Sequence, residues 1–159
     1  MKPIDPRWLP QTVTLYNLFI DPADGTRQHF RTVLEGVRVQ ECRVTLASST
    51  QGFERKSSIT VIIDRRSTAG QGETQAKQYV PPHEWKARPR PEREQCWTLA
   101  EGDLMAVEAG ARQTLAPERD PETETESRFV QTNRLKTITA LKAVVDWDGS
   151  IHHWEAEVD

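Results

Sequence analysis

The sequence lacks the features that mark several protein classes. Its 159 residues include only two cysteines, Cys42 and Cys96, too few for a disulfide framework and without C-x-x-C spacing. This cysteine usage fits a reducing compartment. No apolar run approaches the roughly 18 residues of a membrane-spanning helix, and the opening segment has no signal-peptide core. We therefore expect neither feature, and the formal net charge of −3 argues against a uniformly basic nucleic-acid binder.

Helical periodicity is also nearly absent from the chain. Short apolar or alternating runs are bounded instead by clusters of Gly, Pro, Asp and Ser, which is the pattern of β-strands and turns. At this length one core can form without a disulfide or metal. The sequence therefore predicts an all-β protein, a small single-domain β-barrel or sandwich over residues 1–159 with long polar loops.

The runs predict a particular set of strands. Each hairpin is indicated by a turn sequence, most clearly by Asp148-Gly149-Ser150 near the end of the chain. A separate strand should begin after Gly36 and contain a bulge near Gln40 or Glu41. The expected strands are a hairpin of 12–20 with 26–34, single strands at 37–46 and 57–64, a hairpin of 96–99 with 104–110, and a hairpin of 135–147 with 151–159.

The remaining segments are polar and rich in Pro, Gly or charge, so they should bury little apolar surface. We expect an extended N-terminal arm at residues 1–11 and flexible loops at 47–58, 65–78, 86–95 and 116–128. Charge is divided between two regions: residues 55–93 carry nine Lys or Arg against four Asp or Glu, and residues 101–127 carry eight acids against two arginines.

The aromatic residues divide into core and surface candidates. Tryptophans inside strand patterns are best explained by core packing. The predicted core residues are Tyr16, Trp97, Leu99, Trp147 and Trp154, whereas Trp8 and Trp85 are candidates for exposed contact with a partner.

No catalytic or ligand-binding motif is present. Gly70-Gln71-Gly72 lacks the third glycine of a dinucleotide site. His152 and His153 should point to opposite faces of one strand and so cannot share a metal ion. The two cysteines should act as small hydrophobic residues within strands. We therefore expect no enzymatic activity, no cofactor, and no catalytic, metal-binding or cofactor-binding residue.

Basic residues flank the apolar strand at residues 57–64. Arg55 and Lys56 precede it, and Arg65 and Arg66 follow it. Together with other loop cations they could face DNA phosphates, since Lys and Arg attract the backbone without base contacts. A solvated set of loop charges explains the same pattern.

Several short motifs recur in this order in a known family. They are Thr14-Leu15-Tyr16-Asn17, Gly36-Val37, Val61-Ile62-Ile63, Pro82 with Trp85, Trp97-Thr98-Leu99 with Gly102-Asp103, and His153-Trp154-Glu155. On these motifs, which span nearly the whole chain, the protein resembles an uncharacterised family of small proteins encoded in the structural-gene clusters of tailed phages and prophages, chiefly of Gram-positive hosts.

The resemblance implies a virion neck protein, either a head-closure (stopper) or a head-tail joining component. Such proteins form a ring between the portal or connector and the tail-terminator or tail tube protein, and help to retain packaged double-stranded DNA. The expected location is the virion, assembled in the host cytoplasm. Channel loops would carry Arg55, Lys56, Arg65 and Arg66, and protein partners would meet Trp8, Trp85, Glu122, Glu124 and Glu126. The alternatives are a tail-completion or tail-terminator protein, or a β-barrel nucleic-acid-binding module.

Overall fold

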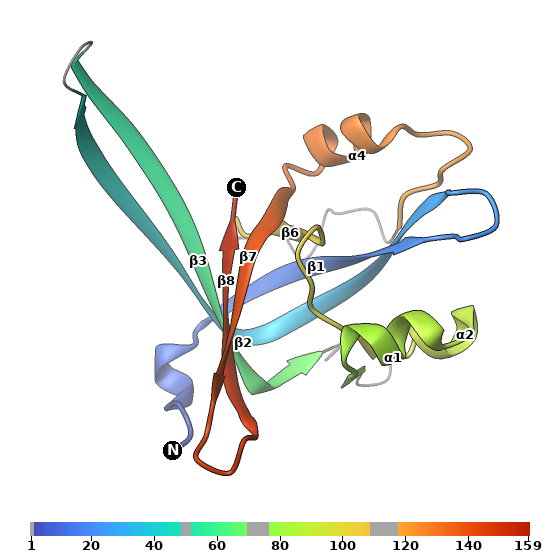
Figure 1. The fold of residues 1–159 in the computed structure, drawn as a ribbon, viewed down its shortest axis with the longest axis horizontal. Helices are drawn as coiled ribbons and strands as arrows, with labels where there is room; N and C mark the ends of the chain where they lie inside the picture. Colours follow the sequence, from blue (N-terminus) through green and yellow to red (C-terminus); the bar gives the residue numbers. More distant parts are fainter. Residues whose placement is uncertain (1, 49–51, 70–76, 109–117) are drawn as a thin grey trace.

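A closed β-barrel forms the body of the protein. The structure is a computed structural model that describes residues 2–48, 52–69, 77–108 and 118–159 (Figure 1). Six strands close in the order β1–β2–β3–β8–β7–β6, with each neighbouring pair antiparallel. Their bounds are β1 Gln11–Ile20, β2 Arg27–Ser48, β3 Gly52–Ala69, β6 Leu104–Ala106, β7 Lys136–Val145 and β8 Ile151–Val158. This confirms the predicted all-β fold in one small domain.

Alternation along the strands fills the barrel. In β8, Trp154, Ala156 and Val158 are buried, as their period of two predicts. Trp97 packs against Trp154 with ring centroids 5.8 Å apart. Trp97, Leu99 and Trp154 belong to the main core cluster, so their predicted core positions are confirmed.

The outer face of β1 is covered as well. Residues 13–17 are all buried, because α4 (Glu126–Thr132) lies over the strand and presses Phe129 edge-on against Tyr16, at a centroid distance of 5.2 Å. Tyr16 thus belongs to a second cluster between barrel and helix. Its burial, also predicted, raises the pKa of the phenol to about 12.

Two short helices close the lower right of the molecule in Figure 1. They are α1 (Pro82–Ala87) and α2 (Arg90–Arg93), each with proline in its first turn, where the missing N–H costs nothing. Trp85 of α1 is fully buried between Phe19 and Phe30. The prediction that Trp85 is an exposed contact was therefore wrong, because the helix turns its ring onto the barrel.

β2 and β3 are far longer than the other strands. Gly36, at a φ of 74°, bends β2 where the register shifts between Glu35 and Val37. The bulge thus lies before the predicted position at Gln40 or Glu41, and β2 is continuous where two strands were expected. Only glycine readily adopts this conformation, which accounts for the bend at this residue.

Several predicted loops are instead regular structure. The segment 47–58 contains the end of β2 and the start of β3, 65–78 begins within β3, 86–95 contains α2, and 116–128 leads into α4. Residues 49–51, 70–76 and 116–117 of these predicted loops lie outside the described residues. In the N-terminal arm, the 3-10 helix η1 (Pro6–Trp8) interrupts the expected extended chain.

The predicted hairpin of 96–99 with 104–110 was also wrong. β5 (Cys96–Trp97) instead pairs in parallel with β4 (Gln78–Tyr79), and β6 pairs with β1 and β7. Residues 109–110 lie outside the described ranges.

The predicted C-terminal hairpin is confirmed, but the predicted core position of Trp147 is wrong. β7 and β8 pair antiparallel across the turn that contains Gly149. Trp147 follows the end of β7 and has no opposing strand, so it is 92% exposed rather than part of the core.

Candidate assembly surfaces

The longest feature outside the barrel is a projecting hairpin formed by residues 42–48 of β2 and 52–58 of β3. β1 pairs with β2 only as far as Val37, and β8 pairs with β3 only from Ile59 onward, so the projecting hairpin pairs with itself alone. At about 3.3 Å per residue it extends roughly 20 Å from the barrel. Figure 1 shows it leaving the body at the upper left.

The described side chains of the projecting hairpin support no core. Cys42, Arg43, Ser57 and Ser58 are all exposed, which corrects the expected burial of Cys42. The guanidinium of Arg43 meets Glu41 at 3.2 Å, but a pair this exposed adds little stability. Where its side chains are described, the projecting hairpin is not packed against the barrel.

The four predicted DNA-facing cations do not share one surface. Arg55 and Lys56 have backbones paired within the projecting hairpin, opposite Thr45 and Val44. Arg65 and Arg66 lie about nine to ten residues further along β3, which corresponds to roughly 30 Å.

Arg66 is already engaged in the body of the protein. Its guanidinium donates to both oxygens of Asp64, at 2.9 and 3.2 Å, and to the carbonyl of Ile4 at 3.2 Å. Burial of Asp64 opposes its ionisation, yet these hydrogen bonds and the charge of Arg66 hold the pKa of the carboxyl below its usual value. Arg66 thus anchors the N-terminal arm.

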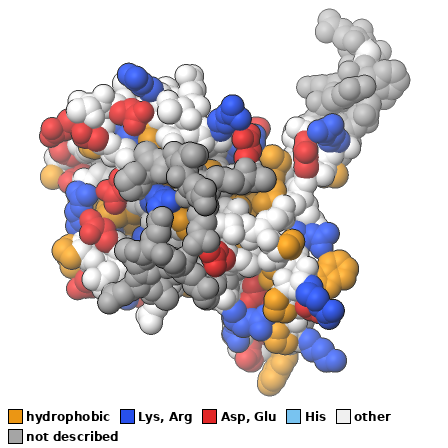
Figure 2. Space-filling view, turned by 180° about the vertical axis from the view of Figure 1, so that it is seen from behind, with side chains coloured by type: hydrophobic (Ala, Val, Ile, Leu, Met, Phe, Trp, Pro, Cys, Tyr) orange, Lys and Arg blue, Asp and Glu red, His pale blue; other side chains and the backbone are white. Residues whose placement is uncertain are grey.

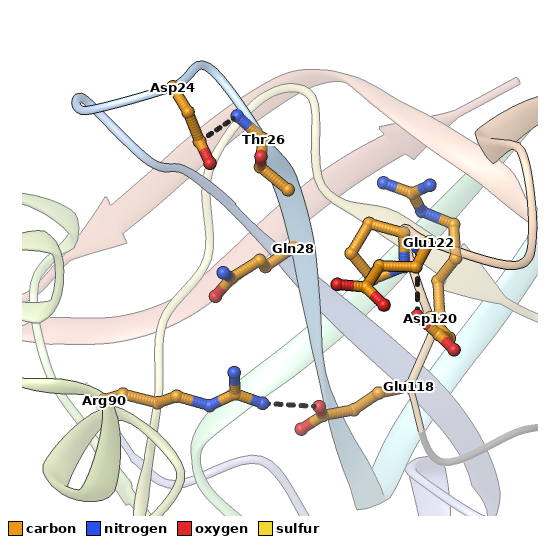
Figure 3. Close-up of a pocket in the computed structure, with 9 residues that line it drawn as sticks. Asp24, Thr26, Gln28, Arg90, Glu118, Asp120 and Glu122 are labelled. Atoms are coloured by element: carbon orange, nitrogen blue, oxygen red, sulfur yellow. Dashed lines mark hydrogen bonds and ion pairs between the residues drawn. The ribbon is translucent and has the colours of Figure 1, made fainter.

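A polar groove lies at the opposite end of the molecule from the projecting hairpin. It is a cavity of about 590 Å³ between the β1–β2 turn, α2 and the segment 118–122. Figure 3 shows Asp24 and Thr26 above it, Gln28 at its centre, and Arg90 reaching across to Glu118 at 3.3 Å. Four acids and two arginines line this groove.

The carboxylates of the groove differ in whether they are held by hydrogen bonds. Asp120 accepts the Glu122 N–H at 2.9 Å, and such hydrogen bonds hold the pKa of Asp120 below its usual value. Within the described ranges, no hydrogen bond or ion pair joins the exposed Glu122 carboxylate to another side chain. Of the three predicted partner-facing glutamates, Glu122 is thus the one that lies in the groove with its carboxylate available.

The other two glutamates contribute to the protein's own structure. Glu126 pairs with Arg27 at 2.5 Å; burial opposes ionisation of Glu126, but the Arg27 bond and charge keep its pKa below the usual value. The Glu124 carbonyl accepts from Arg119 at 2.8 Å, and Arg119 also donates to the Arg27 carbonyl. Arg119 and Glu126 together hold the acidic segment against β2.

A buried polar cluster joins the segment 98–103 to β1. Asp103 accepts from the Leu18 N–H at 2.8 Å, the Asn17 amide at 2.8 Å and the Ala100 N–H at 3.0 Å. Burial raises the pKa of Asp103 to about 6, although these three donors favour the ionised form. Asn17 also bonds both backbone groups of Thr98. Asn17 and Asp103 both lie in motifs singled out from the sequence, but their pairing across the fold could not be predicted.

The two adjacent histidines correct another expectation. The β7–β8 register pairs Val144 with His153 and Val145 with Ile151, which leaves His152 as an extra residue. A bulge of this kind re-aims a side chain, and here it brings the two Nδ1 atoms within 2.7 Å. The argument that the imidazoles must diverge was therefore wrong. His152 Nε2 lies 2.8 Å from the Lys2 carbonyl, so the pair contacts the N-terminal arm.

The described residues contain neither a metal-binding group of side chains nor a disulfide. In the described ranges, no group of three or more His, Cys, Asp or Glu side chains is placed to hold a metal ion. Cys42 and Cys96 are both free thiols. Among the described residues, the helices are too short and too polar to span a lipid bilayer.

The fold and its surfaces define a class: a small closed six-stranded barrel that carries a long self-paired hairpin at one end and a polar groove at the other. The chain belongs to the DUF6751 family, a family of unknown function whose model matches residues 9–158. No curated protein and no solved structure matches the sequence.

Proposed function

We propose that this protein is a non-enzymatic component of a phage neck, acting in head closure or head-tail joining within a ring between connector and tail. The observation that carries the proposal is the projecting hairpin. It is regular in structure yet pairs only with itself beyond the barrel. Two-stranded hairpins are marginally stable in water, and unpaired strand edges invite pairing. Contact with another molecule supplies a physical reason for such an element.

The proposed mechanism is steric and electrostatic. Hairpins from several subunits would narrow an axial channel and hold back packaged DNA, and would reorient on infection. Arg55 and Lys56 are the candidates for meeting DNA phosphates, because both belong to the projecting hairpin. Arg66 is withdrawn from this role, since it is committed to Asp64 and Ile4.

The groove suits protein rather than DNA. Its lining contains Asp24, Glu118, Asp120 and Glu122 against two arginines, and one of those arginines is paired with Glu118. Phosphate would be repelled by this surface, whereas a basic segment of a neighbouring subunit or connector protein would be attracted. The two ends of the molecule would thus contact different partners.

The experiment replaces residues 43–57 with Asn-Gly, which joins Cys42 directly to Ser58 by a two-residue hairpin turn. These residues pair opposite one another, so the replacement shortens the hairpin without a register change. We expect the free energy of unfolding to change by less than about 1 kcal/mol, because the deleted strands pair only with each other and the described side chains among them are exposed. Ring formation on the purified connector, followed by co-sedimentation and electron microscopy, should be lost.

The exposed Lys142→Ala change on β7 serves as the control and should leave assembly intact. A shortened protein that still forms rings and retains DNA would contradict the proposal. A free wild-type monomer that binds DNA at micromolar concentration with a steep salt dependence would favour the nucleic-acid-binding alternative instead.

A further inference from the structure

Two adjacent histidines hold the first residues of the N-terminal arm. The bulge in β8 places the rings of His152 and His153 side by side, with centroids 5.0 Å apart and Nδ1 atoms 2.7 Å apart. His152 Nε2 lies 2.8 Å from the carbonyl oxygen of Lys2. Lys2 and Pro3 are exposed, so this hydrogen bond rather than apolar packing ties them to the barrel. Figure 1 shows the N-terminal segment beside the lower part of the β7–β8 hairpin.

The hydrogen-bond partners of the two rings determine where the protons lie. A carbonyl oxygen only accepts, so His152 Nε2 must carry a hydrogen. A neutral imidazole has one N–H, which leaves His152 Nδ1 as an acceptor, and His153 Nδ1 must therefore donate to it. One added proton is compatible with this arrangement, because it enters at His153 Nε2, which lies 3.6 Å from the Glu155 carboxylate.

A second added proton is not compatible with the same arrangement. With both rings charged, each Nδ1 carries a hydrogen, so two N–H groups would point at each other across 2.7 Å. One ring must then turn away. His153 lies opposite Val144 in the β7–β8 ladder, whereas His152 is the extra residue of the bulge. The ring of His152 is therefore the one that turns, and its hydrogen bond to Lys2 is lost.

The acids around the histidine pair do not offset a second proton, because both are already paired with cations. On β3, Asp64 faces the charge of His152 but is bonded to Arg66 at 2.9 Å. On β8, Glu155 is bonded to Lys142 of β7 at 3.3 Å. Neither carboxylate is free to hold the doubly charged pair in place.

The charge of the N-terminal segment also favours its separation from a charged pair. Its charged side chains are Lys2, Asp5 and Arg7, and Asp5 is bonded to Arg7 at 2.9 Å. Lys2 therefore leaves this segment with a net positive charge. Figure 2, seen from behind, shows further Lys and Arg side chains among hydrophobic ones at the lower right, the side on which the N-terminal segment lies. A second positive charge on the histidine pair would add to the repulsion.

We propose that the histidine pair is a pH-sensitive release device for the N-terminal end of the arm. The pair holds Lys2 while it carries at most one added proton, and releases it on taking up the second. Histidine is the side chain that ordinarily changes charge between about pH 5 and 8, so the device works in that range. Release begins at Lys2, while the bond of Arg66 to the Ile4 carbonyl keeps the rest of the arm in place. The device acts within one chain, so its test is independent of the proposed ring.

NMR of the imidazole rings tests the proton arrangement. In long-range ¹H–¹⁵N spectra at pH 7.5, we expect a hydrogen on Nδ1 of His153 and none on Nδ1 of His152. A hydrogen on Nδ1 of His152 would overturn the proposal, because that ring could not then accept from His153.

A nitroxide spin label at Lys2→Cys tests the release. Lys2 takes part through its backbone carbonyl, so the substitution keeps the contact. Cys42→Ser removes the exposed native thiol, and Cys96 is buried. We expect a largely immobilised label at pH 7.5. At pH 5 the ratio of mobile to immobilised label should rise roughly fivefold or more, as expected for one lost hydrogen bond. An unchanged ratio would overturn the proposal.

The matched variant in the labelled protein is His153→Asn. The asparagine amide can donate to His152 Nδ1 or accept from it, and it takes up no proton, so the label should stay immobilised at pH 5. His83→Asn, at an exposed histidine on α1, is the control and should leave the release unchanged. Equal release in the His153→Asn variant would overturn the proposal, because acid unfolding or another titrating group would then be responsible.

Discussion

The barrel body and the projecting hairpin are built from the same two strands, yet they follow different physical rules. Within the body, Val37, Val61 and Ile63 are fully buried and each strand has neighbours on both sides. Beyond Glu41 and Ile59, the same strands lose those neighbours and their described side chains are exposed. The body is held by burial and buried hydrogen bonds, whereas the described side chains of the hairpin bury no comparable surface. This difference separates residues that are packed in the barrel from exposed residues outside it.

The largest expected effect lies in the barrel core. Trp97→Ala should lower the free energy of unfolding by roughly 3–5 kcal/mol, since it empties a fully buried site beside Trp154. Trp147→Ala removes the same side chain from the exposed turn and should change stability by less than about 0.5 kcal/mol. Urea denaturation measures both, and equal losses would break the distinction between body and surface.

The buried Asp103 cluster should come next. Asp103→Ala leaves the Leu18 and Ala100 N–H groups and the Asn17 amide without their acceptor, and we expect a loss of roughly 3 kcal/mol. Asp103→Asn, which keeps the shape and one acceptor oxygen, should cost less. A loss below about 1 kcal/mol for Asp103→Ala would show that this cluster does not fix the segment 98–103 to β1.

The acid sensitivity of the body should depend on His29. Burial lowers the pKa of this imidazole to about 4, with the Glu126 carboxylate 3.8 Å away opposing the shift. The unfolded chain therefore takes up a proton between about pH 6.5 and 4 while the folded protein does not, so stability falls as pH falls through this window.

Asp103 titrates in part of the same window with the opposite sign. Its pKa of about 6 in the folded protein is raised above the usual value of 3.8, so its contribution to stability is present at low pH and is lost as pH rises through about 6. His29→Leu keeps Asp103 and removes the histidine. Denaturation at pH 7 and pH 5 should show that the change in stability between these pH values is roughly 2 kcal/mol less favourable for the wild type than for the variant, because the Asp103 contribution is common to both. Parallel losses would contradict the assignment to His29.

The smallest expected difference in stability is between variants of two arginines, one in each of the long strands β2 and β3. Arg66→Ala removes the partner of the buried Asp64 and should cost roughly 1–3 kcal/mol. Arg43→Ala removes an exposed pair with Glu41 and should stay within about 0.5 kcal/mol. Thermal unfolding compares the two, and a larger effect at Arg43 would mean that the projecting hairpin contributes to the stability of the body.

Local signals in the sequence predict only part of this architecture. The first and last hairpins follow from turn sequences next to alternating strands, and so do the buried positions of Trp97 and Trp154. Barrel closure through β6 and the parallel β4–β5 pair join segments distant in sequence, which no local pattern indicates. The end of the projecting hairpin, residues 47–58, was predicted as a loop, because this polar segment shows no apolar alternation, although its residues 42–46 were correctly predicted as strand.

The candidate surfaces show the same limit. The acidic segment was expected to meet a partner, but its division into Glu122 in the groove and Glu126 paired with Arg27 depends on how the segment folds over β2. Trp85 was predicted to be exposed and Trp147 to be buried, but the structure shows the reverse. Trp85 lies on a helix that faces the barrel, and Trp147 follows the end of its strand. The bulge at His152 depends on the register with β7.

The most direct test of the proposed neck role is a structure of the protein mixed with a purified phage connector. The account predicts a ring in which every projecting hairpin leaves its own barrel and contacts the axial channel or a neighbouring subunit, while the barrels keep the fold described above. A ring whose projecting hairpins all stand free in solvent, or a protein bound to the connector only as isolated monomers, would contradict the claim that this element exists for assembly.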